Sequence, residues 1–402
     1  MPSATKVFTG YRVLSRSYFH LSILFVFFHD RGFSLPTVEL TLAVYGAALA
    51  FSGSVTKPLA ARLSLTAAVA AGEWLKALGL VLLALPGGLP MAVAGQIVAA
   101  LGFSLASGTD SALLAEICKR DGADARTWEA RSGSLTFAAA LVAGVLGAIV
   151  YQWSHQAPFV LSAVMSALAA LTVPIVGRGL TGAPKKSRDP ALADEEAPHR
   201  KDPRYSAALR WSAYYTVVRA FVLALFIGFL PYLLYLRLHV SLPLFGVVLG
   251  SYTLSGYFTA RNGRRAVDRF GARATAAACA ALAGAGLLIL LWQPNTPGAA
   301  VATLALGAGV GAVRPVAVGA IGELLADRPA AERAAALRAN EARFAVVNTL
   351  LILLAGLLLD RVGFPHVLLG VVVGYLVLAA AAVLALPRAT DPEPAAEPAT
   401  AS

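Results

Sequence analysis

Four ionisable side chains, Arg314, Asp110, Glu73 and Lys76, stand inside long apolar segments of the sequence. A charged side chain at the centre of a bilayer costs about 2.5 to 3.5 kcal/mol on insertion scales, so each such residue is a functional candidate. An arginine can hold an anion, and a desolvated carboxylate can bind and release a proton near neutral pH. Anion binding and proton exchange are therefore the chemistry that these residue types could perform.

The two arginines in apolar segments are candidates for substrate binding. Arg314 stands within its segment and is followed by Pro315, which we expect to open the helix locally. The alternative for Arg314 is a structural cation satisfied by backbone carbonyls or a neighbouring acid. For Arg219, near the inner end of another segment, snorkelling of the long side chain to the membrane surface is the favoured alternative.

The carboxylates are candidates for proton coupling. Asp110 has two interpretations, a proton-binding group or a helix cap and salt bridge to an arginine such as Arg131. Glu73 and Lys76 are three residues apart, so a helix places them on one face where they neutralise each other. A structural pair is the favoured interpretation, with a part in proton coupling as the alternative.

Uncharged polar side chains could complete a binding cavity, with interfacial anchoring or helix–helix hydrogen bonding as the alternatives. These candidates are Tyr232, Tyr252, Tyr257, Gln96 and Asn348. The six histidines and two cysteines show no paired metal-ligand spacing, so we expect no metal site and no cofactor.

The composition indicates which elements must position these residues. Of 402 residues 58% are hydrophobic and 14% charged, and the mean hydropathy is +0.70. This composition predicts an all-α integral membrane protein and argues against a soluble enzyme. Apolar windows separated by Gly, Pro or charged breaks predict twelve membrane-spanning helices. Their ranges are 11–30, 38–56, 66–86, 91–115, 133–153, 158–177, 212–236, 243–260, 274–292, 299–325, 343–359 and 366–387.

The distribution of charge predicts the orientation. Outside the helices, the lysines and arginines gather on the side of the two termini, and only Arg31, Arg237 and Arg361 fall in loops of the other side. This bias predicts cytoplasmic termini and explains the net charge of +11 without a nucleic-acid partner. We expect a six-helix bundle over 1–177, a cytoplasmic linker over 178–210, a second bundle over 211–387 and a disordered tail over 388–402.

The two bundles are predicted to be copies of one unit. Shifting the sequence by 207 residues aligns Ser34-Leu35-Pro36 with Ser241-Leu242-Pro243 and needs no insertion. Other aligned pairs are Arg12 with Arg219, Gly79 with Gly286, Gly102 with Gly309, and Glu116 with Glu323. An even number of helices per unit makes the repeat parallel, with an axis along the membrane normal and a cavity between the halves.

These features resemble the major facilitator superfamily. The loop after the eighth predicted helix, Gly263 to Gly271, is similar to that family's G-x-x-x-D-R-x-G-R motif and contains Asp268 and Arg269. The first-half counterpart keeps Arg62 but has Lys57, Ala61 and Ser64 at the Gly, Asp and Gly positions. The resemblance implies gating roles for Arg62, Asp268 and Arg269, while Glu116 and Glu323, which share a repeat position at inner helix ends, are predicted gate salt bridges.

The resemblance implies a secondary active transporter that works by alternating access. Small residues on the fifth and eighth helices, among them Gly147, Gly246 and Gly250, are expected to let these helices face each other across the halves. The prediction is proton-coupled export of a small organic molecule, either a drug or an anionic carboxylate-type siderophore or metabolite, by a monomer in the cell inner membrane, and the alternative is import of a nutrient or siderophore. A membrane-embedded enzyme and a non-transporting sensor are less consistent with the sequence, because neither a catalytic constellation nor a signalling domain is recognisable.

Overall fold

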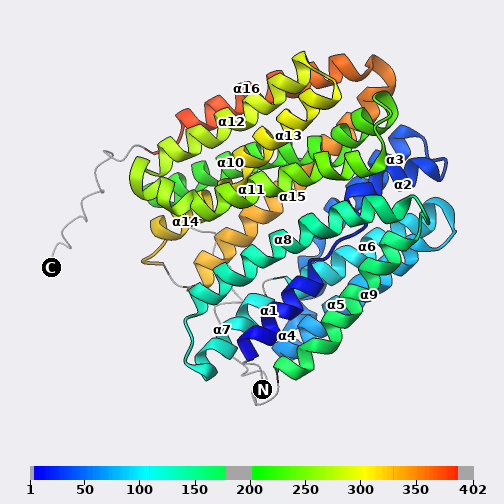
Figure 1. The fold of residues 1–402 in the computed structure, drawn as a ribbon. Coiled ribbons are helices and arrows are strands. Elements are labelled where there is room, and N and C mark those ends of the chain that lie inside the picture. Colours follow the sequence, from blue (N-terminus) through cyan, green and yellow to red (C-terminus); the bar gives the residue numbers. More distant parts are fainter. Residues whose placement is uncertain (1–3, 108, 178–201, 329, 388–402) are drawn as a thin grey trace.

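The computed structural model describes residues 4–107, 109–177, 202–328 and 330–387, and this part of the chain is built of helices without a strand. Two helical bundles lie side by side, one from each half of the sequence (Figure 1). The all-α fold predicted from composition is therefore confirmed.

The first bundle contains six helical segments, three of which are divided. The elements are α1 Ala4–Ser15, η1 Leu21–Ile23 and α2 Leu24–Asp30, then α3 Leu35–Phe51 and α4 Gly53–Arg62, α5 Leu65–Ala84, α6 Gly88–Ala106 and α7 Thr109–Asp121, α8 Ala125–Tyr151, and α9 Ala157–Val176. Each segment covers one of the first six predicted spans.

The second bundle repeats this plan. Its elements are α10 Pro203–Ala224 with η3 Leu225–Phe229 and η4 Tyr232–Arg237, α11 Leu242–Phe270, α12 Ala272–Trp292, α13 Thr296–Gly311 and α14 Val313–Leu324, α15 Ala330–Val362, and α16 Phe364–Leu384. Among the described residues nine helices are long and apolar enough to cross a membrane, or ten if the bent pair α3 and α4 is one span. The other two predicted spans are the broken segment of α1 to α2 and α11, whose second half is rich in arginine.

The packing of glycines confirms the repeat of 207 residues. A Cβ placed on Gly79 of α5 would lie 2.5 Å from the Ala99 nitrogen of α6, and one placed on Gly286 of α12 would lie 3.0 Å from the Leu306 nitrogen of α13. The contacted residues Ala99 and Leu306 are separated by 207 positions, as the two glycines are. The second crossing point repeats in the same way, with Gly102 against Lys76 and Gly309 against Ala283.

Two segments break where sequence and packing demand it. The expected opening beside Pro315 is present, because α13 ends at Gly311 and α14 begins at Val313. The first segment is interrupted after Ser15, and the backbone of Phe19 lies so close to Gly147 of α8 that a side chain at Gly147 has no room. Such breaks expose backbone groups within a span and occur in proteins that bind ligands there.

The halves touch through α8 with α11 and through α3 with α15. A Cβ on Gly246 would lie 2.8 Å from the Ala148 Cβ, so the predicted facing of the two helices is correct. Gly147 does not take part, because it packs against Phe19 of the first segment. The contacts extend from the bond between Asp30 and Tyr235 to the ring pair of Phe137 and Tyr257. Towards the termini α8 and α11 diverge (Figure 1).

The boundary of the predicted linker needs a correction. Residues 203–210 are the first turns of α10, because Pro203 occupies its first position and Asp202 caps it by accepting the Arg204 N–H at 2.9 Å. That bond and the guanidinium of Arg328 hold the pKa of Asp202 below its usual value. Residues 178–201 and the predicted tail 388–402 lie outside the described residues.

Candidate functional site

Two arginines of the second bundle share one carboxylate. Arg314 Nε lies 3.3 Å from Glu341 Oε1, and Arg219 Nη1 lies 3.5 Å from Glu341 Oε2. Tyr215 donates its hydroxyl to Glu341 at 2.8 Å and also bonds Arg219. Helices α10, α14 and α15 thus bring two positive charges to one negative charge.

This arginine cluster, Arg219, Arg314 and Glu341, is only partly covered by the rest of the protein. The exposed fractions of its side chains are 28%, 65% and 43%. The guanidinium of Arg219 lies over the Phe344 ring at 4.5 Å. Whether Arg219 binds substrate or snorkels to the membrane surface stays a prediction. For Arg314, the neighbouring acid of the structural alternative is Glu341.

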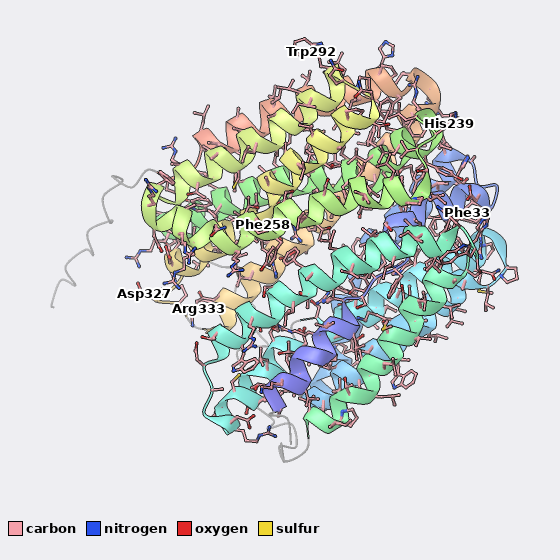
Figure 2. All side chains as sticks on the ribbon, in the orientation of Figure 1. Phe33, His239, Phe258, Trp292, Asp327 and Arg333 are labelled. Carbon is pink, nitrogen blue, oxygen red and sulfur yellow. The ribbon has the colours of Figure 1, made fainter. Side chains whose placement is uncertain are left out.

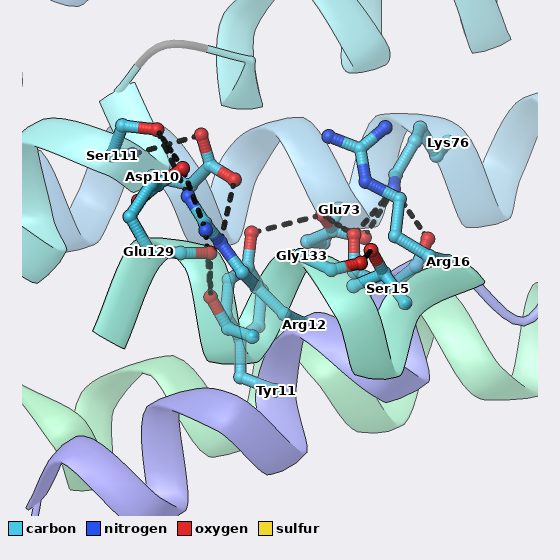
Figure 3. Close-up of polar contacts among 12 residues, drawn as sticks. Tyr11, Arg12, Ser15, Arg16, Glu73, Lys76, Asp110, Ser111, Glu129 and Gly133 are labelled. Atoms are coloured by element: carbon cyan, nitrogen blue, oxygen red, sulfur yellow. Dashed lines mark hydrogen bonds and ion pairs between the residues drawn. The ribbon is translucent and has the colours of Figure 1, made fainter. Parts of the chain in front are cut away.

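The first bundle holds a fully buried ion pair. Lys76 Nζ lies 2.7 Å from Glu73 Oε2, and the side chains are 6% and 0% exposed. Ser15 and Tyr11 of α1 donate hydroxyls to Glu73 at 2.7 and 3.2 Å (Figure 3). The predicted mutual neutralisation is confirmed, and the pair ties α5 to the end of α1.

A second network, around the buried Arg12, joins α1, α7 and α8. Arg12 Nε lies 3.3 Å from Asp110 Oδ2, and Arg12 Nη1 lies 2.8 Å from Glu129 Oε1 (Figure 3). The salt-bridge interpretation of Asp110 is therefore correct, with Arg12 as a partner, while Arg131, the arginine given as an example, stacks on Trp128. The role of Asp110, Glu73 and Lys76 in proton coupling stays a prediction.

The remaining predicted binding residues are dispersed. Tyr232 stacks on Phe364 within the second bundle, and Tyr252 stacks on Phe226. Tyr257 reaches across to Phe137 of the first bundle. Gln96 and Asn348 are buried and each keeps one amide atom without a partner among the described residues, Nε2 and Oδ1. Tyr252 lies within electrostatic reach of Arg219, whereas no hydrogen bond or ring contact among the described residues joins the other four to the arginine cluster.

The predicted gating residues are exposed and form no ion pair within the described part of the chain; they are Arg62, Asp268, Arg269, Glu116 and Glu323. The motif around them has a structural basis nonetheless. Gly263 lets α11 approach Ala312 at the α13–α14 break, and Gly271 ends α11 with a φ of 82°. Both positions favour glycine for steric reasons.

Three charged residues were overlooked in the sequence. Glu341 lies two residues before the span predicted over 343–359 and so falls outside it. Arg16 was assigned to the N-terminal charges, although it lies at the break after α1 with its guanidinium 4.9 Å from the Phe103 ring. Glu39 is the third, and its position as a carboxylate inside the second apolar window was the available signal.

The fold and the paired bundles define a multi-pass membrane protein with two repeated halves. Residues 212–402 match the sequence model of the Major Facilitator Superfamily. The second half of the chain is therefore similar to this superfamily. Among the curated proteins, no sequence is similar enough to count as a match.

Solved structures share the fold over nearly the whole chain. A peptide transporter POT is 16% identical, with 94% of this chain and 93% of that chain covered and a TM-score of 0.72. A POT family transporter in complex with 5-aminolevulinic acid is 13% identical over 96% of each chain, with a TM-score of 0.75. The nucleoside transporter NupG, as a mutant, is 13% identical over 96% and 99%, with a TM-score of 0.73.

Proposed function

We propose that this protein is a secondary transporter that moves a small organic anion across the membrane by alternating access. The observation that carries the proposal is the arginine cluster, in which two guanidinium groups share the single carboxylate of Glu341. The surplus positive charge stands ready for an anion, and the planar fork of arginine matches a carboxylate.

The position of the cluster supports this role. It lies where α10, α14 and α15 meet, and its side chains are only partly covered by the protein, so they are free to contact a ligand. Arg16 adds a cation from the first half at the break after α1. A ligand with two anionic groups, such as a di- or tricarboxylate metabolite, has the charge to engage both halves.

The predicted orientation completes the proposal. With cytoplasmic termini in the inner membrane, the side on which α8 and α11 diverge faces the cytoplasm. Cargo would enter from there, and a proton gradient would drive its export without a cofactor. The alternative is import, in which the proton and the cargo move in the same direction through the same cycle. The structural relatives include peptide and nucleoside transporters.

Flux into vesicles tests the proposal. Purified protein in liposomes with an imposed pH gradient is offered labelled citrate, a hydroxycarboxylate siderophore, an acidic dipeptide, a nucleoside and a lipophilic cation. We expect gradient-dependent movement of at least one of the anions, lost in Arg314→Gln and kept in Arg361→Gln, a matched change at an exposed arginine. Movement of the cation or the nucleoside alone would contradict an anionic cargo, and no movement of any compound would contradict transport.

A further inference from the structure

Glu39 is a buried carboxylate without a partner. It lies in the second turn of α3, is 1% exposed, and neither carboxylate oxygen has a hydrogen-bond partner within the described residues. Every other buried carboxylate of the first half is paired, Glu73 with Lys76 and Asp110 with Arg12. Glu39 therefore differs from these two carboxylates, because no cation among the described residues neutralises it.

The surroundings of Glu39 belong to the other half of the molecule. A Cβ placed on Gly228 of η3 would lie 2.7 and 2.8 Å from its two carboxylate oxygens, and one placed on Gly356 of α15 would lie 2.6 Å from its Cγ. The carboxyl group is thus enclosed between α3 and two glycines of the second bundle. This enclosure exists only while the halves are closed at this level.

No ion pair or hydrogen bond among the described residues joins a charged group to Glu39. The elements packed against α3 are α2, α4, α6, α15 and η3, of which α6 and η3 contain no titratable residue. On α2, Asp30 accepts hydroxyls from Tyr151 and Tyr235, and His29 faces the Tyr235 ring. The acidic and basic residues of α15 are Asp360 and Arg361, exposed one turn beyond Gly356, and Glu332, Arg333, Arg338, Glu341 and Arg343 towards the termini; α4 carries Lys57 and Arg62 at that end.

The cost of burial depends on the charge of this group. An isolated ionised carboxylate in a low-dielectric interior is far more costly than a neutral carboxylic acid, which loses only the hydrogen bonds of a polar group. Separation of the halves would admit water to Glu39 and remove that difference. The closed arrangement is therefore compatible with the proton-bearing form, and the hydrated arrangement accommodates both forms.

We propose that Glu39 is a proton-binding site whose occupation permits the halves to close on the side away from the termini. The proposal rests on the alternating access of the proposed function. Closure takes up one proton from water on that side and opening returns it. The equilibrium constant for closure then changes by up to about tenfold per pH unit where hydrated Glu39 titrates.

Distances between spin labels test the proposal. Phe33 and His239 lie at the end away from Asp327 and Arg333 (Figure 2), so labels on Ser34→Cys and His239→Cys report that side. The buried Cys118 and Cys279 are replaced by alanine. In lipid nanodiscs without cargo, we expect the separated population to rise between pH 5 and 9 in the parent protein, and Glu39→Gln to stay closed throughout.

Controls separate this site from its neighbours. Asp30→Asn should keep the pH response, because Asp30 lies outside the Glu39 enclosure. Gly228→Ala should favour separation at every pH, whereas Gly370→Ala, which meets no atom within 4 Å, should not. A pH-independent parent distance, or an unchanged response in Glu39→Gln, would overturn the proposal; if Glu39→Gln does not fold, an unchanged distribution in Gly228→Ala would overturn it. The readout needs no cargo, so failure of the flux experiment leaves this result distinct.

Discussion

At the scale of single residues, the arginine cluster predicts that anion binding needs the shape of the Arg219 guanidinium as well as its positive charge. Arg219→Lys keeps the positive charge but loses the fork that spans Tyr215 and Glu341. A charge-assisted hydrogen bond contributes about 1.5 to 3 kcal/mol, so we expect the KM of the transported anion to rise roughly tenfold or more. Initial-rate flux measures this, with Arg328→Lys as the control away from the cluster. An unchanged KM would remove Arg219 from the binding site.

The buried pair of the first half predicts the opposite behaviour, a loss of stability. Lys76→Met leaves Glu73 charged and fully buried, which costs about 3 to 5 kcal/mol of the free energy of unfolding. Adding Glu73→Gln should restore most of it, because the hydroxyls of Tyr11 and Ser15 can still bond the amide. Unfolding in mixed micelles tests this, and equal stabilities of the single and double variants would contradict the structural interpretation.

At the scale of elements, the crossing of α5 and α6 depends on glycine. A Cβ on Gly102 would lie 2.5 Å from the Lys76 nitrogen and 2.6 Å from the Gly72 oxygen, and these backbone atoms cannot turn aside. Gly102→Val should therefore lower stability by at least about 1 to 3 kcal/mol, and its repeat mate Gly309→Val should do the same. Thermal unfolding compares both with Gly370→Val, which has free space. A Gly102→Val protein as stable as Gly370→Val would refute the repeated crossing.

The elements were largely predictable from sequence, and their breaks only in part. Apolar runs and the 207-residue shift located every helical segment, because burial in a bilayer demands long apolar stretches. The opening at Pro315 followed from the missing N–H of proline, but the interruption after Ser15 depends on contact with Gly147, a residue far along the chain. Start positions such as Pro203 were missed because polar turns extend a helix beyond the bilayer.

The site was less predictable than the helices, because it depends on contacts between residues that are far apart in the sequence. Charges in apolar windows identified Arg219, Arg314, Glu73 and Lys76, but their partners are set by tertiary packing. Glu341 and Asp110 could be paired with their arginines only once α10, α14 and α15, or α1 and α7, were placed in space.

At the scale of the whole molecule, the two halves meet on one side and diverge on the other (Figure 1). Close contact at Gly246 and Gly46 on one side, with separation of α8 and α11 near the termini, is one end state of a rocking motion about the repeat axis. Alternating access requires that opening one side closes the other, because the halves move as rigid bodies.

The most direct test wedges the closed side open and measures both sides. Gly246→Val places bulk against Ala148 without touching Glu39. Label pairs at Ser34→Cys with His239→Cys and at Arg131→Cys with Arg264→Cys report the two ends in separate samples. Alternating access predicts that Gly246→Val lengthens the first distance and shortens the second, while Gly370→Ala changes neither. A second distance that lengthens or stays constant while the first grows would contradict the account.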